Sequence, residues 1–421
     1  MVEIAALAEA LGIEGGIIAL AATGRTETIC FGMEAQRRVD AGTLFQAAST
    51  GKHLTACAVL ELAQSGRIEL GLPFGHYLAD APPAWADRSI LSLLLHTSGI
   101  PEYLAYIDGE DVPTTRTAFM QRYRDLAPVA AEGAVWGYSN TNYILLGFLI
   151  AAVSGQTYAA CIDNMLAREK VDGAQVASPE WVRAQNLAGV GQRGTDWDSR
   201  EREVIGDGDI AFTVDGALGW LNSLLSRPQA DPLFEPATLG NGRHSPYACG
   251  WFVEHMVGEP IAHHAGHYGG YTAMAILNRG MQAGVLAVCN HAPGNTRAIR
   301  ALAQAALEAF VPGATPLALR PVKDNRPDLT ATVRKQLIRS DGTIDREAFA
   351  PELQAAIDKG GPVRGVVNLW TGVEPQSFDL IEEYHEGSDL FRRYRLRYSD
   401  RIEHLLVGTA ADGKIFWAWP L

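Results

Sequence analysis

The hydrophobic pattern at the start of the chain predicts a helix followed by a β-hairpin. Residues 2–11 have the apolar spacing of an amphipathic helix. Two apolar, β-rich runs follow, Gly16–Ala22 and Thr26–Phe31, and a short connection that contains Gly24 joins them. A glycine in so short a connection is typical of an antiparallel hairpin.

Further along the chain, a helical pattern gives way to strands. Lys52–Gln64 has a helical repeat, and residues from about 90 to 240 look mostly helical and rich in loops. From about residue 246 the pattern predicts three strands: Tyr247–Met256, Tyr271–Leu277 and Gly284–Cys289. A helix over Thr296–Phe310 follows. We therefore expect an α+β fold, in which an antiparallel sheet is flanked by helices and carries an all-helical region.

A proline-rich stretch separates a large domain from a small one. Residues 313–328 have the composition of a linker, which leaves residues 1–312 for the large domain and 329–421 for the small one. In the small domain a helix at about 347–359 is expected to pack on an antiparallel sheet. Its predicted strands lie near 363–371, 377–384, 390–398, 401–409 and 414–419.

Three arginines occupy alternate positions in one predicted strand of the small domain, Phe391–Tyr398. This alternation predicts a half-buried strand with one polar face. Such a face could attract an acidic partner, but solvated strand faces have the same composition. We expect this domain to serve in packing or dimerisation, which leaves a homodimer possible. Direct contact of the domain with the substrate is the alternative.

Composition and charge narrow the classes of protein that the chain can represent. Its 421 residues are 47% apolar and 20% charged, as in ordinary globular proteins. The net charge of −13 argues against a nucleic-acid partner. No apolar run approaches the roughly 18–20 residues of a membrane span. Glu3 stands where a signal peptide would carry lysine or arginine. We expect a cytoplasmic location and no membrane partner, although a removed leader stays open.

Neither the cysteines nor the histidines have the spacing of a metal site. The five cysteines are widely spaced, and no CxxC pair occurs, so neither a zinc cage nor a disulfide framework is indicated. His263, His264 and His267 lie within five residues, but no H-E-x-x-H motif occurs and no cysteine or acidic ligand is suitably spaced nearby. We expect no metal and no other cofactor.

The sequence Ser49-Thr50-Gly51-Lys52 is the first candidate for catalysis, because residues three apart at the start of a helix lie on one face. The Lys52 amine can therefore reach the Ser49 hydroxyl. A serine hydroxyl is a weak nucleophile until a neighbouring base accepts its proton. An amine can do so only if its pKa is lowered, as burial among polar groups does. An isolated S-x-x-K also arises by chance, so the pair needs support from other motifs.

Two further motifs supply that support. Tyr138-Ser139-Asn140 offers a phenol that can carry a proton and an amide that can hold a substrate carbonyl. His264-Ala265-Gly266-His267 lies just before or on a strand, and its glycine would let the backbone approach a ligand closely.

A fourth motif, Leu93–Ile100, has the sequence L-L-L-H-T-S-G-I and resembles a helix end and turn beside a site. No lysine follows Ser98 at the third position, so Ser98 is not favoured as a nucleophile. We expect His96 to be structural.

Together these motifs resemble the serine β-lactamase-like superfamily, which includes class C β-lactamases, D,D-peptidases, D-aminopeptidases and related esterases and acyltransferases. S-T-G-K, L-L-L-H-T-S-G, Y-S-N-T-N-Y and H-A-G followed by G-G-Y occur in the family's order over about residues 10–312. The resemblance implies that Ser49 is acylated and that Lys52 takes part in proton transfer. Tyr138 would be the general base or leaving-group relay, and Asn140 would hold the substrate.

The third motif departs from the class C pattern, which usually has lysine where His264 stands. The H-x-G form is similar to that of D-aminopeptidases, esterases and acyl-transfer enzymes. The resemblance implies an oxyanion hole formed by the backbone N–H groups of Ser49 and His267, with Gly266 beside it. Because histidine carries less dependable positive charge at neutral pH, efficient β-lactam hydrolysis is not expected.

Three functions follow as hypotheses. The first is a serine hydrolase that forms an acyl-enzyme from a small ester, or from a peptide that can contain D-residues. The second passes the acyl group to an amine or alcohol, as acyltransferases and peptide cyclases do. The third, a non-catalytic binding protein, predicts damage to at least one motif, and none is damaged.

Overall fold

The computed structural model describes residues 2–34, 37–107, 113–177, 203–228, 230–268, 270–290, 296–338, 345–351, 353–354, 374–399 and 401–420. The chain divides into two compact units, Met1–Ala314 and Thr315–Leu421. Each unit is described by itself.

The first unit is built on a seven-stranded antiparallel sheet with the order β3-β2-β1-β10-β9-β8-β7. Its strands are β1 (Gly15–Ala22), β2 (Arg25–Glu34), β3 (Arg37–Arg38), β7 (Phe252–Met256), β8 (Glu259–Tyr268), β9 (Tyr271–Asn278) and β10 (Ala283–Cys289). The hairpin β1–β2 forms as predicted. Since β1 pairs with β10, segments from the two ends of the unit join in one sheet, with Gly16 opposite Cys289.

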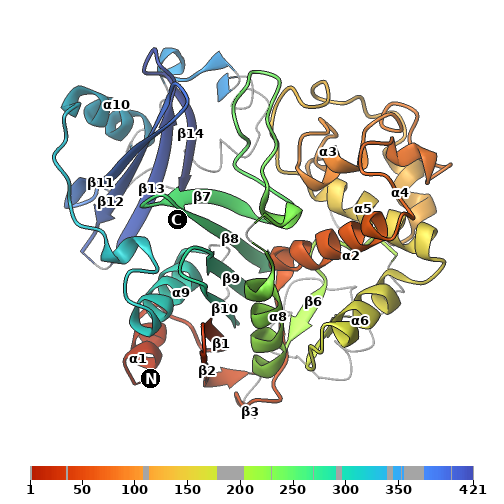
Figure 1. Ribbon diagram of the computed structural model, residues 1–421, viewed down its shortest axis with the longest axis horizontal. Helices are drawn as coiled ribbons and strands as arrows, with labels where there is room; N and C mark the ends of the chain where they lie inside the picture. The colour runs from red at the N-terminus through yellow and green to blue at the C-terminus, as the bar shows by residue number, and fades with distance from the viewer. Residues whose placement is uncertain are drawn as a thin grey trace. The chain divides into compact units, whose positions relative to one another are not determined.

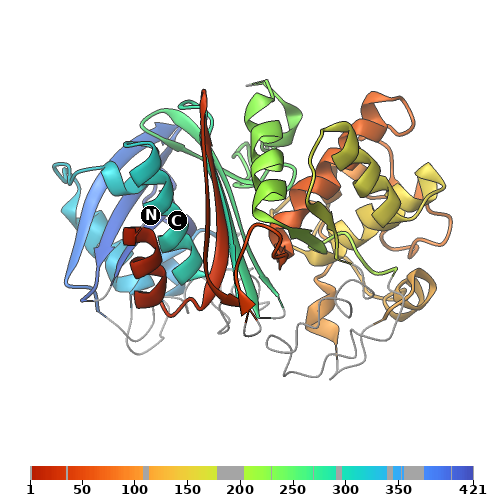
Figure 2. The ribbon, with the colours of Figure 1, turned by 90° about the horizontal axis from the view of Figure 1, so that it is seen from below.

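Helices cover both faces of this sheet. Figure 2 shows α1 (Val2–Ala10) and α9 (Arg297–Phe310) on one face and α8 (Val214–Ser226) on the other. Strands β9 and β10 are therefore buried along their whole length. Thr213 caps α8 by accepting a hydrogen bond from the Gly216 N–H. The predicted α+β architecture, an antiparallel sheet flanked by helices, is confirmed.

The helical region contains α2 (Lys52–Gln64), α3 (Ile90–Leu94), α4 (Arg116–Arg122), α5 (Asn140–Ser154) and α6 (Tyr158–Arg168). Helix α5 is apolar on nearly all sides because it packs in the centre, against α2, α3 and α6 (Figure 1). No single helix among the described residues is long and apolar enough to cross a membrane; α5 and α6 pass that test only as a pair bent by 81°.

A small three-stranded sheet supports the turn before α2. It has the order β4-β6-β5, formed by β4 (Phe45–Gln46), β6 (Ile210–Phe212) and β5 (Ala174–Val176). Strands of two or three residues carry no clear alternation, so the sequence pattern did not predict this sheet. It links the segment before Ser49 to the segment before α8.

Within the described residues, the second unit contains a four-stranded antiparallel sheet with a helix packed on it. The strands are β11 (Ser377–Glu386), β12 (Asp389–Arg397), β13 (Ile402–Thr409) and β14 (Ile415–Pro420), in that order. Helix α10 (Pro327–Leu337) packs on the sheet through Leu329, Val333 and Leu337. This helix was not predicted, and it begins inside the expected linker. Of the predicted helix at 347–359, residues 347–348 lie in the 3₁₀ turn Arg346–Ala348, and residues 351, 353 and 354 are helical. Residue 352, residues 355–359 and the predicted strand near 363–371 lie outside the described residues.

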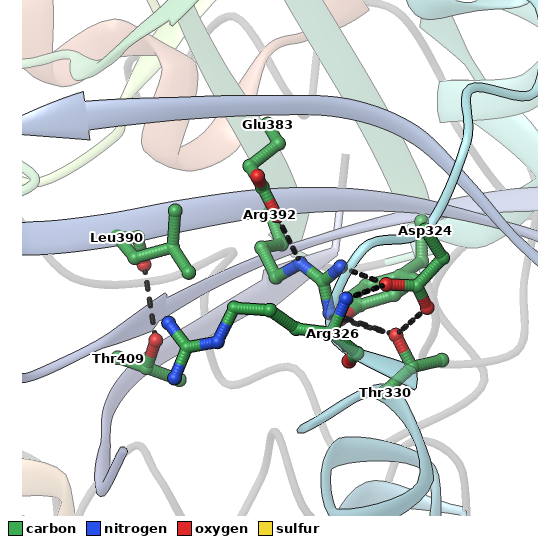
Figure 3. Close-up of polar contacts among 8 residues, drawn as sticks. Asp324, Arg326, Thr330, Glu383, Leu390, Arg392 and Thr409 are labelled. Carbon is green, nitrogen blue, oxygen red and sulfur yellow. Dashed lines mark hydrogen bonds and ion pairs between the residues drawn. The ribbon is translucent and has the colours of Figure 1, made fainter. Parts of the chain in front are cut away.

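Arg392 ties the segment before α10 to this sheet (Figure 3). Its side chain is fully buried and forms ion pairs with Asp324 and Glu383. It also donates hydrogen bonds to the Thr330 hydroxyl (2.8 Å) and the Tyr394 hydroxyl (3.0 Å). A guanidinium has five N–H donors in a fixed plane, which suits it to join several acceptors at once.

The polar face predicted for β12 carries arginines, but most of it is covered within the second unit. Arg393 is fully buried and pairs with Glu382, while Arg395 is 6% exposed and donates to three backbone carbonyls of residues 316–319. Arg397 is exposed. Strand alternation gives the face of each residue but not what covers that face, which is why the sequence pattern did not show this burial.

Candidate active site

Ser49 lies in a 3₁₀ turn, Ala48–Gly51, between β4 and α2. The rest of the turn is buried, but Ser49 is partly accessible. Ala48 has a φ of 48°, a left-handed conformation that a residue with a Cβ seldom adopts. In a 3₁₀ turn residues i and i+3 are aligned, so the turn points the Ser49 and Lys52 side chains in the same direction.

The Lys52 side-chain nitrogen is held by three oxygen atoms. Lys52 is fully buried. Its Nζ lies 3.3 Å from Ser49 Oγ, 2.7 Å from Asn140 Oδ1 and 2.5 Å from the Asp207 carbonyl oxygen. Ser49 lies three residues before Lys52, whereas Asn140 and Asp207 lie 88 and 155 residues further along the chain.

Tyr138 and Asn140 approach Lys52 from the start of α5. The Lys52 Nζ lies 5.1 Å from the centre of the Tyr138 ring. Asn140 is the first residue of α5, and its N–H donates to Glu102 Oε2 at 2.5 Å. Burial raises the pKa of the Glu102 carboxyl. Glu102 thus holds the backbone of a residue whose side chain contacts Lys52.

His264 is buried on β8, and both its ring nitrogens are hydrogen bonded within the protein. Its Nδ1 lies 2.7 Å from the Ala265 carbonyl oxygen, which can only accept, so Nδ1 carries the proton. Its Nε2 therefore accepts from the Tyr247 hydroxyl at 3.1 Å. Burial, helped by the charge of Lys52, lowers the pKa of His264 to about 3. The imidazole is neutral at physiological pH.

Gly266 brings β8 into contact with the Ser49 turn. A Cβ on Gly266 would lie 2.3 Å from the Ala47 carbonyl oxygen and 3.0 Å from Ser49 N, so no other residue fits without movement. This contact places β8 beside the Ser49 N–H. The side chain of His267 is exposed, and its backbone pairs opposite Thr272. Its part in an oxyanion hole stays a prediction.

The structure thus brings together Ser49, Lys52, Tyr138, Asn140 and His264, as the motifs predicted. Three contributors were missed: the Glu102 carboxylate, the Asp207 carbonyl and the Tyr247 hydroxyl. A backbone carbonyl leaves no trace in residue types. Glu102 follows Pro101, shortly after the L-L-L-H-T-S-G motif. An acidic residue so close to a motif of the site could have indicated its role.

The histidine cluster does not converge on a common point. His263 stacks on Phe252 and lies 3.7 Å from Glu254, whereas His264 bonds Tyr247. Within the described parts of the chain, no group of three or more histidine, cysteine, aspartate or glutamate side chains is placed to hold a metal ion.

The family model described as Beta-lactamase matches residues 3–310. The chain therefore belongs to the beta-lactamase family, and the resemblance inferred from the motifs is confirmed.

Two relatives show how distant the similarity is. Penicillin-binding protein 4* of Bacillus subtilis (strain 168) is 25% identical over 276 residues, which are 58% of this chain and 60% of the relative. Protein flp of Staphylococcus aureus (strain MW2) is 25% identical over 271 residues, 59% of this chain and 53% of the relative. The chain thus spans between half and three fifths of the length of these curated relatives.

Solved structures share the fold. A penicillin-binding protein homologue from Pyrococcus abyssi, described as octameric, has a TM-score of 0.60 at 17% identity and covers 96% of this chain and 89% of its own. A beta-lactamase/D-alanine carboxypeptidase from Pseudomonas syringae has a TM-score of 0.59 at 17% identity, over 73% of this chain and 100% of its own. Similarity at this identity concerns the fold alone.

Proposed function

We propose that this protein is a serine hydrolase that acts on an ester or amide through an acyl-enzyme on Ser49. The observation that carries the proposal is the buried Lys52 side chain, whose Nζ lies 3.3 Å from Ser49 Oγ and is held there by two further acceptors. A buried lysine bonded to a partly accessible serine is the arrangement that serine activation requires. A packing lysine would have no need of an accessible hydroxyl.

The reaction divides into two acyl transfers. Ser49 Oγ forms a bond to the substrate carbonyl carbon, while its proton passes to the deprotonated amine of Lys52 or phenolate of Tyr138. The bond to the leaving group then breaks, and the departing oxygen or nitrogen takes up that proton. In the second transfer, water gives a proton to the same base and forms a bond to the acyl carbon. The bond between that carbon and Ser49 Oγ then breaks, Ser49 Oγ takes up the proton, and the acid is released. The N–H groups of Ser49 and His267 are proposed to stabilise the oxyanion in both transfers.

The neutral state of His264 supports a substrate without a carboxylate beside β8. Its ring nitrogens bond Ala265 and Tyr247, and its pKa is lowered to about 3, so His264 supplies no positive charge. Small esters and peptides, including peptides with D-residues, meet this condition better than β-lactams. The names of the relatives, a penicillin-binding protein and a beta-lactamase/D-alanine carboxypeptidase, agree with attack on an acyl group. Transfer of the acyl group to an amine or alcohol stays an alternative prediction, as does a homodimer.

Covalent labelling tests the proposal. The protein is treated with a fluorophosphonate or a fluorescent penicillin, and the adduct is located by mass spectrometry. We expect a fluorophosphonate adduct on Ser49 that is lost in Ser49→Ala and retained in Ser65→Ala, an exposed serine just after α2. An adduct that survives Ser49→Ala would refute the mechanism. Nitrophenyl esters, set against L- and D-amino-acid anilides, then define the substrate class.

A further inference from the structure

His96 lies just after α3 and is buried beside Tyr138. Its φ of 55° is left-handed, a conformation that is unfavourable for a residue with a Cβ. Surrounding contacts must impose such a conformation, and residues that keep one are frequent at functional sites. The reason for the conformation at His96 is found in the loop that it faces.

His96 forms hydrogen bonds with the residues on both sides of Tyr138. Its carbonyl oxygen accepts from the Gly137 N–H at 2.9 Å. Its ring Nδ1 lies 3.3 Å from the Ser139 N and 3.1 Å from Asn142 Nδ2. Both of these nitrogens are donors, so Nδ1 is the acceptor and the ring proton is on Nε2. The left-handed backbone directs the carbonyl and the ring towards the same loop.

The imidazole also packs directly on the Tyr138 ring. The two ring centres are 4.5 Å apart, and the rings of Tyr247 and Tyr143 follow at 4.6 and 5.0 Å. Nε2 has no hydrogen-bond partner among the described residues, so the ring is held by Nδ1 and by these aromatic contacts. Burial and the charge of Lys52 keep the pKa of His96 well below its ordinary value, which preserves Nδ1 as an acceptor.

We infer that His96 is a positioning residue that sets the orientation of Tyr138 for proton transfer to the leaving group. The inference rests on the proposed serine hydrolase function. His96 holds the backbone on both sides of Tyr138 and packs on the Tyr138 ring. These contacts keep the Tyr138 hydroxyl in one place relative to Ser49. A displacement of about 1 Å in such a group can cost on the order of 100-fold in rate.

Two substitutions separate this role from the loss of a buried side chain. His96→Asn keeps an acceptor where Nδ1 stands and uses a residue type that tolerates a left-handed backbone. His96→Gly also tolerates that backbone but removes both the acceptor and the ring. His404→Asn is the matched control, since His404 is another fully buried histidine and belongs to the second unit.

The experiment compares a nitrophenyl ester with the ethyl ester of the same acid. An alkoxide leaves only if it is protonated, whereas nitrophenolate leaves without a proton. We expect His96→Gly to lose about 100-fold in kcat on the ethyl ester, and less than about tenfold on the nitrophenyl ester. KM should stay within about threefold of wild type, since substrate contacts are kept. His96→Asn should recover most of the kcat, and His404→Asn should act like wild type on both esters.

Equal losses of His96→Gly on both esters, or no loss, would overturn the inference, as would a loss in His404→Asn equal to that in His96→Gly. If His96→Gly does not fold, His96→Gln replaces it, because its amide lies one carbon beyond the Nδ1 position; the same ester difference is then required. Failure of the proposed function is seen separately, as wild-type protein without an adduct on Ser49.

Discussion

Lys52 connects the parts of the candidate site, because its Nζ contacts the Ser49 hydroxyl, the Asn140 side-chain amide oxygen and the Asp207 carbonyl oxygen. The spacing of Ser49 and Lys52 was evident from the sequence, since three residues along a helical turn bring two side chains to one face. What the spacing could not show is which groups orient the amine. Asn140 and Asp207 lie 88 and 155 residues further along the chain, and only folding brings them to Lys52.

Replacing Lys52 by alanine should abolish most of the acylation of Ser49. The substitution removes both the proton carrier and the charge beside Ser49, so we expect the labelling rate to fall well beyond tenfold while the protein stays folded. Stopped-time fluorophosphonate labelling measures the rate, and circular dichroism checks the fold. Lys335→Ala, an exposed lysine of α10, is the control and should label normally. Near-normal labelling of Lys52→Ala would show that another base serves Ser49.

At the scale of helices and strands, the hydrophobic pattern identified most elements but did not show what covers each of them. The pattern predicted β9, β10 and α9, because long apolar runs and helical repeats are strong local signals. It did not show that the polar face of β12 is mostly covered, where Arg393 is buried with Glu382. A buried arginine looks like a solvated one in sequence, since the difference lies in a partner on a neighbouring strand. Helix α10 was missed because Pro327, at its first turn, was taken as part of a linker.

The Arg392 network predicts that Arg392→Lys will destabilise the second unit. A lysine amine cannot contact Asp324 and Glu383 in the planar arrangement of the guanidinium (Figure 3). We expect a loss of about 1–3 kcal/mol in the free energy of unfolding, measured by urea denaturation. Arg334→Lys, which alters an exposed pair with Glu374, should change it by less than about 0.5 kcal/mol. Equal losses of unfolding free energy in Arg392→Lys and Arg334→Lys would mean that the buried ion pairs of Arg392 stabilise the unit no more than an exposed pair does.

For the whole molecule, burial keeps several histidines neutral. Desolvation lowers the pKa of each of four histidines below the ordinary value of 6.5: His53, His96, His264 and His404. The value falls to about 3 for His264 and His404. The unfolded chain therefore binds more protons than the folded chain between about pH 6.5 and 3, and stability must fall as the pH drops through this window.

Acidification should thus weaken the protein through these residues. Each histidine contributes up to about 1.4 kcal/mol per pH unit below pH 6.5. Urea midpoints at pH 7.5, 6.5 and 5.5 measure the effect. His404→Asn should flatten the dependence, whereas substitution of the exposed His76 should not. Buried carboxyls such as Glu34 have the opposite effect, because a raised carboxyl pKa adds stability as the pH falls. This contribution is the same in wild type and in both variants, so it cancels when their slopes are compared. An unchanged slope in His404→Asn would contradict the neutral burial of that residue.

The amino-acid sequence by itself determined the family, the main helices and strands, and the residue types of the site. Those properties are local, because motifs and periodicities are carried by neighbouring residues. Only the tertiary structure decided the charge of His264, the burial of the β12 arginines and the contacts of His96 on both sides of Tyr138. These depend on solvent exclusion and on partners far away in the chain, and folding alone sets both.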